Sequence, residues 1–122
     1  MKVLIVEDDV FLAKVYNAQF KKAGIETIVL NNGEKAHAMA KSENPDIIML
    51  DLMLPPPKNG FEILEELKKD PKTKNIPVVI LSMLGSNEDV AKTEKLGAIR
   101  HIPKTGASFH EVVERITELA KK

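Results

Sequence analysis

The chain has 122 residues, of which 43% are hydrophobic and 30% charged, and this composition predicts one soluble globular domain over residues 1–122. Its formal net charge is zero, which argues against direct binding of nucleic acid or of a membrane surface. Without cysteine and without an apolar run of spanning length, disulfides, thiol chemistry and a transmembrane helix are excluded. We expect a cytoplasmic protein.

Strand and helix patterns alternate along the chain. Runs rich in apolar residues predict strands over 3–6, 25–30, 47–51, 78–81 and 99–102. Apolar residues at helical spacing predict helices over 9–23, 36–40, 61–70, 86–96 and 109–120. This alternation is typical of an α/β fold with helices on both faces of a parallel sheet.

Short polar signals are expected to start several of the helices. Ser86 with Asp89, and Ser108 with Glu111, have the spacing of capping boxes. The segment 31–33, Asn-Asn-Gly, predicts a turn that carries a capping candidate for the second helix.

The composition of the strands predicts their order. Residues 3–6, 47–50 and 78–81 of the first, third and fourth runs are wholly apolar, as expected for strands that are buried on both faces. The second and fifth runs contain Glu26, Arg100 and His101, so we expect them at the edges. This arrangement fits a doubly wound five-stranded sheet of order 2-1-3-4-5, the flavodoxin-like order.

Chemically active side chains follow four of these strands. Glu7 and Asp8 follow the first, Asp51 and Ser82 end the third and fourth, and Lys104 follows the fifth. The carboxyl ends of parallel strands share one edge of the sheet, so these groups are expected to converge. An acidic cluster of oxygen ligands suits Mg²⁺, and a lysine with a hydroxyl can bind a phosphoryl group. A carboxylate can itself accept that group as an aspartyl phosphate.

In this order the residues resemble the receiver domain of bacterial two-component response regulators over the whole chain. The resemblance rests on Val-Glu-Asp at 6–8, on Asp51 with the later Pro55 and Gly60, and on Ser82, Gly97-Ala98 and Lys104. It implies a phosphorylation-activated signalling switch rather than an enzyme with an external substrate. The phosphoryl group would come from a histidine kinase, a phosphotransfer protein or a small donor such as acetyl phosphate.

The resemblance also implies a role for each matching residue. Asp51 would be the phosphoacceptor. Mg²⁺ or Mn²⁺ would be bound by Asp8, Asp51 and the main-chain carbonyl of Met53, and Glu7 would bind it through water or orient the acidic cluster. Ser82 and Lys104 would contact the phosphoryl group. Ser82 and the residue at the switch position, here His101, would then relay the change to the face formed by the fourth helix, the fifth strand and the fifth helix.

Several positions depart from the pattern of that family. His101 stands where Tyr or Phe is usual, and its charge predicts a pH-sensitive switch. Thr105 follows Lys104 in place of proline, so we expect a trans peptide bond there. The acidic pair of dimerising receivers is replaced by Ile99-Arg100, which predicts a monomer or a weak dimer.

Other patterns give weaker expectations. His37 and His110 are expected to be exposed on their helices. The fourth helix has a thin apolar stripe of Val90, Ala91 and Leu96, which predicts a weakly held and movable element.

Three alternative functions remain open at this stage. A Mg²⁺-dependent phosphatase with an aspartyl nucleophile would need a second acid two residues after Asp51, where Met53 stands. A flavodoxin-like nucleotide binder would need a Gly/Ser/Thr phosphate loop where residues 7–9 are Glu-Asp-Asp. A degenerate receiver that is never phosphorylated is disfavoured by the complete set of acids, hydroxyl and lysine. The sequence fits both a stand-alone receiver and the receiver part of a longer regulator.

Overall fold

A parallel sheet forms the centre of the computed structural model, which describes residues 1–82, 87–104 and 108–121. The strands of the described residues are β1 (Lys2–Val6), β2 (Glu26–Leu30), β3 (Ile47–Asp51), β4 (Val78–Ser82) and β5 (Arg100–Pro103). They lie in the order β2-β1-β3-β4-β5, and all four neighbouring pairs are parallel. The predicted order is therefore confirmed, with β2 and β5 at the edges.

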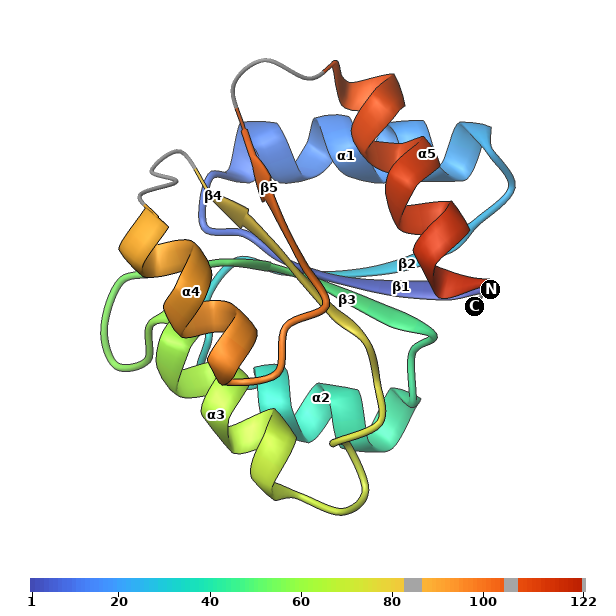
Figure 1. Ribbon diagram of the computed structural model, residues 1–122. Helices are drawn as coiled ribbons and strands as arrows, with labels where there is room; N and C mark the ends of the chain where they lie inside the picture. Colours follow the sequence, from blue (N-terminus) through green and yellow to red (C-terminus); the bar gives the residue numbers. More distant parts are fainter. Residues whose placement is uncertain (83–86, 105–107, 122) are drawn as a thin grey trace.

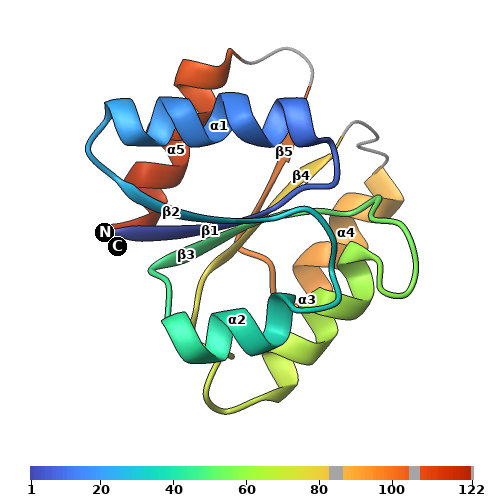
Figure 2. The ribbon, with the colours of Figure 1, turned by 180° about the vertical axis from the view of Figure 1, so that it is seen from behind.

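Helices cover the sheet in two layers (Figures 1 and 2). One face carries α1 (Val10–Lys22) and α5 (Phe109–Ala120), and the other carries α2 (Ala36–Glu43), α3 (Gly60–Lys69) and α4 (Asn87–Lys95). Each apolar strand supplies both layers, because successive side chains of a strand point to opposite faces. In β1, for example, Leu4 and Val6 belong to the core under α2 and α3, whereas Val3 and Ile5 belong to the core under α1 and α5.

Side-chain caps fix the first turn of three helices. Asp9 accepts a hydrogen bond from the Leu12 N–H at the start of α1, and Ser108 accepts one from the Glu111 N–H at the start of α5. A reciprocal capping box, which the sequence analysis missed, joins Asn59 and Glu62 at the start of α3. These caps satisfy amide groups that have no partner inside the helix.

The cap expected for the second helix was wrong. The residue at the N-cap position of α2 is Lys35, which makes no side-chain capping bond. Asn32 instead accepts a hydrogen bond from the Glu34 N–H within the preceding turn. The capping box expected at Ser86 lies outside the described residues, as does the Lys104–Thr105 bond.

His37 was expected to be exposed, but the structure contradicts this. Its ring is partly buried and its Nε2 lies 2.8 Å from Asp70 Oδ2, while Lys41 Nζ lies 3.1 Å from the same oxygen. The Lys72 N–H, Lys41 and His37 together lower the pKa of Asp70 to about 2. The end of α3 therefore contacts α2 through a charged cluster. His110 is exposed, as expected.

The apolar stripe expected on the fourth helix is only partly confirmed, because Leu96 packs against the core but Ala91 does not take part. Thr93 is the buried residue of α4, whereas Ala91 is exposed and Val90 and Leu96 are only partly buried. The hydroxyl of Thr93 can be buried because it donates a hydrogen bond to the Val90 carbonyl one turn earlier. No helix among the described residues is long and apolar enough to cross a membrane.

Candidate phosphoacceptor site

The carboxyl ends of four neighbouring strands bring the predicted site residues together. Asp51 is the last residue of β3 and is in register with Leu81 of β4. Ser82, the last residue of β4, is in register with Pro103, which precedes Lys104. The Lys104 N–H donates to the Ser82 carbonyl at 2.9 Å, so the chain after β5 stays beside β4.

Three carboxylates form an acidic cluster at this edge. Glu7, Asp8 and Asp51 each offer one oxygen, and these oxygens all lie within 4.8 Å of one another. Glu7 and Asp51 are only 1% and 4% exposed, whereas Asp8 is exposed to solvent. The cluster is therefore a mostly buried site with an opening at Asp8.

Lys104 lies against the two buried members of the cluster. Its Nζ is 2.6 Å from Glu7 Oε1 in an ion pair and donates a hydrogen bond to Asp51 Oδ2 at 3.2 Å. One ammonium group cannot balance three carboxylates, so the cluster keeps an excess of negative charge.

The pKa values of the buried groups reflect this charge balance. Burial raises the pKa of Glu7 to about 7; the contact with Lys104 opposes the rise and the charge of Asp51 adds to it. Burial alone would lower the pKa of Lys104, but Glu7 and Asp51 raise it above its usual value. Because its pKa is raised, Lys104 keeps its proton, and its ammonium group is a fixed positive charge. Burial, with a contribution from Glu7, also raises the pKa of the neighbouring group Tyr16 to about 12.

Main-chain contacts hold Glu7 in place. Its N–H donates to the Leu30 carbonyl, and its carbonyl accepts a hydrogen bond from Asn31 Nδ2 at 3.1 Å. Its Oε2 accepts from the Asp9 N–H. The sequence predicts only a turn at Asn31, although the position of this residue directly after edge strand β2 is a signal for a contact at the carboxyl ends of the strands.

The connection from β3 to α3 passes close to Asp51. The Met53 N–H donates to Asp51 Oδ1 at 3.2 Å, and the Met53 side chain is 60% exposed. The Gly60 N–H donates to the Leu52 carbonyl. A Cβ at Gly60 would lie 2.4 Å from the Asp51 carbonyl oxygen, so glycine allows α3 to begin directly against the end of β3.

The donor atoms fit a hard divalent cation. All the side-chain ligands are carboxylate oxygens, and Lys104 balances only one of the three negative charges. Glu7 Oε1 is buried and accepts no hydrogen bond from the described residues, although Lys104 lies close to it. Carboxylate oxygens with an excess of negative charge suit Mg²⁺ or Mn²⁺.

His101 belongs to β5, and its ring lies against α4. Its Nδ1 is 3.5 Å from Thr93 Oγ1, and its Nε2 is buried without a hydrogen-bond partner among the described residues. Burial lowers the pKa of His101, and the charges of Asp89 and Glu94 on α4 oppose that shift. The ring therefore lies partly inside the protein next to α4. Ser82 is fully buried at the end of β4.

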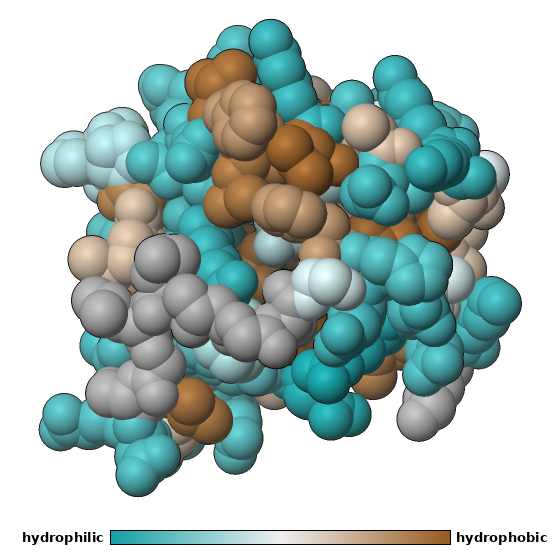
Figure 3. Space-filling view, turned by 90° about the horizontal axis from the view of Figure 1, so that it is seen from above, coloured by the Kyte–Doolittle hydropathy of each residue, from teal (hydrophilic) through white to brown (hydrophobic). Residues whose placement is uncertain are grey.

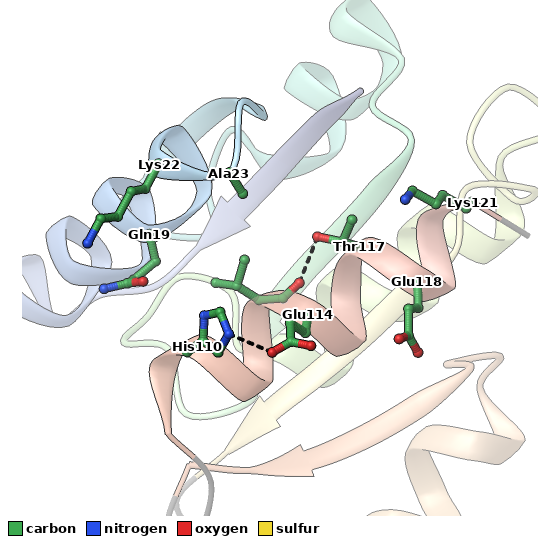
Figure 4. A pocket seen from close by; sticks show the side chains of 9 residues that line it. Gln19, Lys22, Ala23, His110, Glu114, Thr117, Glu118 and Lys121 are labelled. Carbon is green, nitrogen blue, oxygen red and sulfur yellow. Dashed lines mark hydrogen bonds and ion pairs between the residues drawn. The ribbon is translucent and has the colours of Figure 1, made fainter.

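Two other surface features lie outside the acidic cluster. Hydrophobic side chains gather on the outer surface that α1 and α5 form (Figure 3). The exposed hydrophobic residues at the starts of these two helices are Val10, Phe11 and Phe109. A groove of about 350 Å³ runs between the later parts of the same helices, with Gln19 and Lys22 on one side and Glu114 and Glu118 on the other (Figure 4). None of the predicted site residues lines that groove.

Comparisons with known proteins point to one family. The model of the response regulator receiver domain matches residues 3–117. The phosphate regulon regulatory protein PhoB of Pseudomonas aeruginosa is 31% identical over 120 residues, which are 98% of this chain and 52% of PhoB. Sporulation initiation phosphotransferase F of Bacillus subtilis is 33% identical over 84% of this chain and 81% of its own length.

Solved structures agree with the sequence matches. The receiver domain of the Francisella response regulator 1452 is 32% identical with a TM-score of 0.87, over 98% of this chain and 96% of that one. The BeF₃-activated receiver domain of Klebsiella pneumoniae RstA is 26% identical with a TM-score of 0.89 over the full length of both chains.

The comparisons also set the extent of the match. The chain spans about half the length of the first two curated relatives, 49% of RpaA from Synechocystis and 52% of PhoB. The part that is matched is the part with the acidic cluster and the five-stranded sheet. The chain belongs to the response regulator receiver domain family, whose role is that of a phosphorylation switch in two-component signalling.

Proposed function

We propose that Asp51 is the phosphoacceptor of this receiver and that residues 1–122 act as one receiver domain. The observation that carries the proposal is the position of Asp51 at the end of β3, with two further carboxylates and Lys104 Nζ around it. Phosphoryl transfer needs mainly positioning and neutralisation of charge. Glu7, Asp8, Asp51 and the Met53 carbonyl would hold Mg²⁺ or Mn²⁺, and the metal would balance charge on the phosphoryl oxygens.

Lys104 and Ser82 would bind the phosphoryl group after transfer. Lys104 keeps its proton because its pKa is raised, so it can form an ion pair with the phosphoryl group. A group gripped by Ser82 and Lys104 in one conformation would favour that conformation. His101, packed against Thr93 of α4, would relay the change to the face of α4, β5 and α5.

The phosphodonor would be a histidine kinase or a phosphotransfer protein, with acetyl phosphate as a small substitute. An exposed apolar patch beside a site is typical of a docking surface. Phe11 is 76% exposed and Val10 is also exposed, and both follow the acidic cluster directly in the chain. We also propose a cytoplasmic location, because the relatives include a DNA-binding transcriptional regulator, RpaA of Synechocystis.

In this proposal the protein assists its own phosphorylation and dephosphorylation and turns over no external substrate. A phosphatase with an aspartyl nucleophile would need an acid two residues after Asp51. The side chain at that position is the exposed thioether of Met53, which can neither donate nor accept a proton for turnover.

Intact-mass measurement after incubation with acetyl phosphate tests the proposal. We expect the mass of one phosphoryl group to be added only with Mg²⁺, and not in Asp51→Asn. Asp9→Asn is the matched control: it lies next to the acidic cluster but only caps α1, and asparagine caps equally well.

Two other outcomes would contradict the proposal. Loss of acetyl phosphate without an adduct would indicate a phosphatase. No adduct and no loss of donor would indicate a degenerate receiver or a nucleotide binder, and a Mg²⁺ titration would then show whether the acidic cluster binds metal.

A further inference from the structure

The only two arginines of the sequence, Arg100 and Arg115, line one groove. Arg100 belongs to edge strand β5 and Arg115 to α5, and Glu118 and Leu119 complete the lining of a groove of about 380 Å³. Arg100 points to the same face of the sheet as Ile102, two residues later. Ile102 packs in the core under α5, which places the Arg100 side chain on the α5 side of the sheet.

Both arginines carry charge that the described residues do not balance. Arg100 and Arg115 are exposed, and neither forms an ion pair within the part of the chain that the structure describes. Glu118 is the one acid in the described lining of the groove. Two guanidinium groups in one groove repel each other, and an anion bound between them removes that repulsion.

The kind of cation indicates the kind of anion. All other basic side chains of the chain apart from the histidines are lysines, yet this groove has arginine on both elements. The planar guanidinium binds a carboxylate through two parallel hydrogen bonds, which lysine cannot do. The groove therefore has the chemistry for two carboxylates, with Leu119 available for an apolar contact and Glu118 for a basic one.

We propose that the groove between β5 and α5 docks an acidic segment of a partner protein through Arg100 and Arg115. The acidic segment would belong to a protein that binds the face of α4, β5 and α5. Only the signalling role of this docking rests on the proposed function. The two charges are present whether or not Asp51 is phosphorylated, so the test uses the unphosphorylated protein and its failure is distinct from a failure of the phosphoacceptor proposal.

Charge favours an acidic protein segment over two other occupants. Two copies of this groove placed face to face would bring four guanidinium groups against two carboxylates, which disfavours a second copy of this chain. Nucleic acid needs a stripe of positive charge along its backbone. Here the exposed Glu111, Glu114 and Glu118 of α5 interrupt any such stripe, so the two arginines suit a short segment with two carboxylates.

NMR of the arginine side chains tests the inference. The two arginines give two Nε–H signals, which single-residue variants assign. The probe is a 12-residue peptide with two glutamates one helical turn apart and a leucine between them, and its control is the same peptide with lysines. We expect the acidic peptide to shift both signals in a saturable way, more strongly at low salt, and the lysine peptide to shift neither.

Variants and competitors decide the outcome. The double variant Arg100→Gln, Arg115→Gln should weaken peptide binding at least about tenfold, because the loss of even one hydrogen bond to a charged group has about that effect. Lys72→Gln on the exposed α3–β4 connection should not weaken it. Absence of any shift, or an equal shift with the lysine peptide, overturns the inference. Binding of a 12-base-pair DNA duplex without binding of the acidic peptide overturns it too. So does self-association in sedimentation that the double variant abolishes.

Discussion

Lys104 contacts the same carboxylates that would hold a metal ion. Its Nζ lies 2.6 Å from Glu7 and 3.2 Å from Asp51, so the lysine and a bound Mg²⁺ would both neutralise the two buried members of the acidic cluster. A lysine that competes with a metal lowers the affinity of the site for that metal. The same lysine would bind the phosphoryl group once Asp51 is modified.

Lys104→Met should therefore have two opposite effects. Mg²⁺ should bind several-fold to about tenfold more tightly, because a tenfold change corresponds to only about 1.4 kcal/mol of lost competition. The yield of phosphorylated protein should fall. Calorimetric titration of Mg²⁺ and intact mass after acetyl phosphate measure the two effects. Weaker Mg²⁺ binding in Lys104→Met would show that the lysine supports the metal site instead.

His101 predicts a loss of stability in acid. Burial lowers its pKa below the usual 6.5, so folding favours the neutral ring. This contribution is complete above pH 6.5 and decreases as the pH falls from 6.5 toward the lowered pKa of the folded state. Asp89 and Glu94 reduce the effect because they favour the charged ring.

Urea unfolding of the chain and of His101→Tyr at pH 7.5 and pH 5.5 measures this contribution. The stability of the chain relative to His101→Tyr should decrease at pH 5.5. His37 and His110 are present in both proteins, so their titration cancels in the comparison. A pH-independent difference between the two proteins would contradict the prediction.

At the scale of elements, the start of α3 is set by its close approach to β3. Asn59 and Glu62 cap the helix, and Gly60 packs against the main chain of Asp51 and Leu52. The sequence suggested a glycine in a proline-rich loop, and the structure shows that this glycine carries the contact between the helix and the strand end that holds the proposed phosphoacceptor.

Gly60→Ala should damage both stability and the site. The added Cβ would lie 2.4 Å from the Asp51 carbonyl oxygen, and overpacking of this kind costs about 1–3 kcal/mol. Because β3 or α3 must shift, phosphorylation by acetyl phosphate should slow as well. Urea unfolding and the rate of mass gain measure the two effects.

Gly24→Ala is the control for that experiment. Gly24 has φ +78° and no atom within 4 Å of an added Cβ, so alanine there costs about 1–2 kcal/mol of backbone strain without a clash. It precedes β2 at the amino ends of the strands, whereas the acidic cluster lies at their carboxyl ends. The phosphorylation rate of Gly24→Ala should be unchanged. An equal slowing in Gly24→Ala and Gly60→Ala would mean that the loss of stability alone slows phosphorylation.

At the scale of the whole molecule, metal binding at one edge of the sheet should stabilise the entire fold. The acidic cluster consists of the two residues that follow β1 and the last residue of β3, and these strands lie beside each other in the sheet. A ligand that binds only the folded state adds to the free energy of unfolding, by about 1.4 kcal/mol at ten times its dissociation constant.

Thermal unfolding with and without Mg²⁺ tests this linkage. Mg²⁺ at ten times its dissociation constant should raise Tm by a few degrees in a domain of this size, on the order of 2–8 °C. Asp8→Ala should abolish the shift with little change in Tm without metal, because Asp8 is exposed. A shift that persists in Asp8→Ala would place the metal elsewhere.

The sequence by itself determined the elements, the order of the strands and the family. Apolar runs and helical spacing are local signals, and the wholly apolar runs 3–6, 47–50 and 78–81 indicated strands inside the sheet. It also located Glu7, Asp8, Asp51, Ser82 and Lys104 at one edge, because each follows or ends a parallel strand. The contacts among these five residues were expected from topology alone, and their chemical roles stay predictions.

Tertiary packing alone decided contacts between residues that are distant in the chain. No periodic signal predicts the pairing of His37 with Asp70, the hydrogen bond from Asn31 to the Glu7 carbonyl or the burial of Thr93 on the inner side of α4. The meeting of Arg100 with Arg115 in one groove has none either. Such contacts depend on how the helices pack on the sheet, which no local sequence pattern encodes. A small change in this packing brings polar side chains together or separates them.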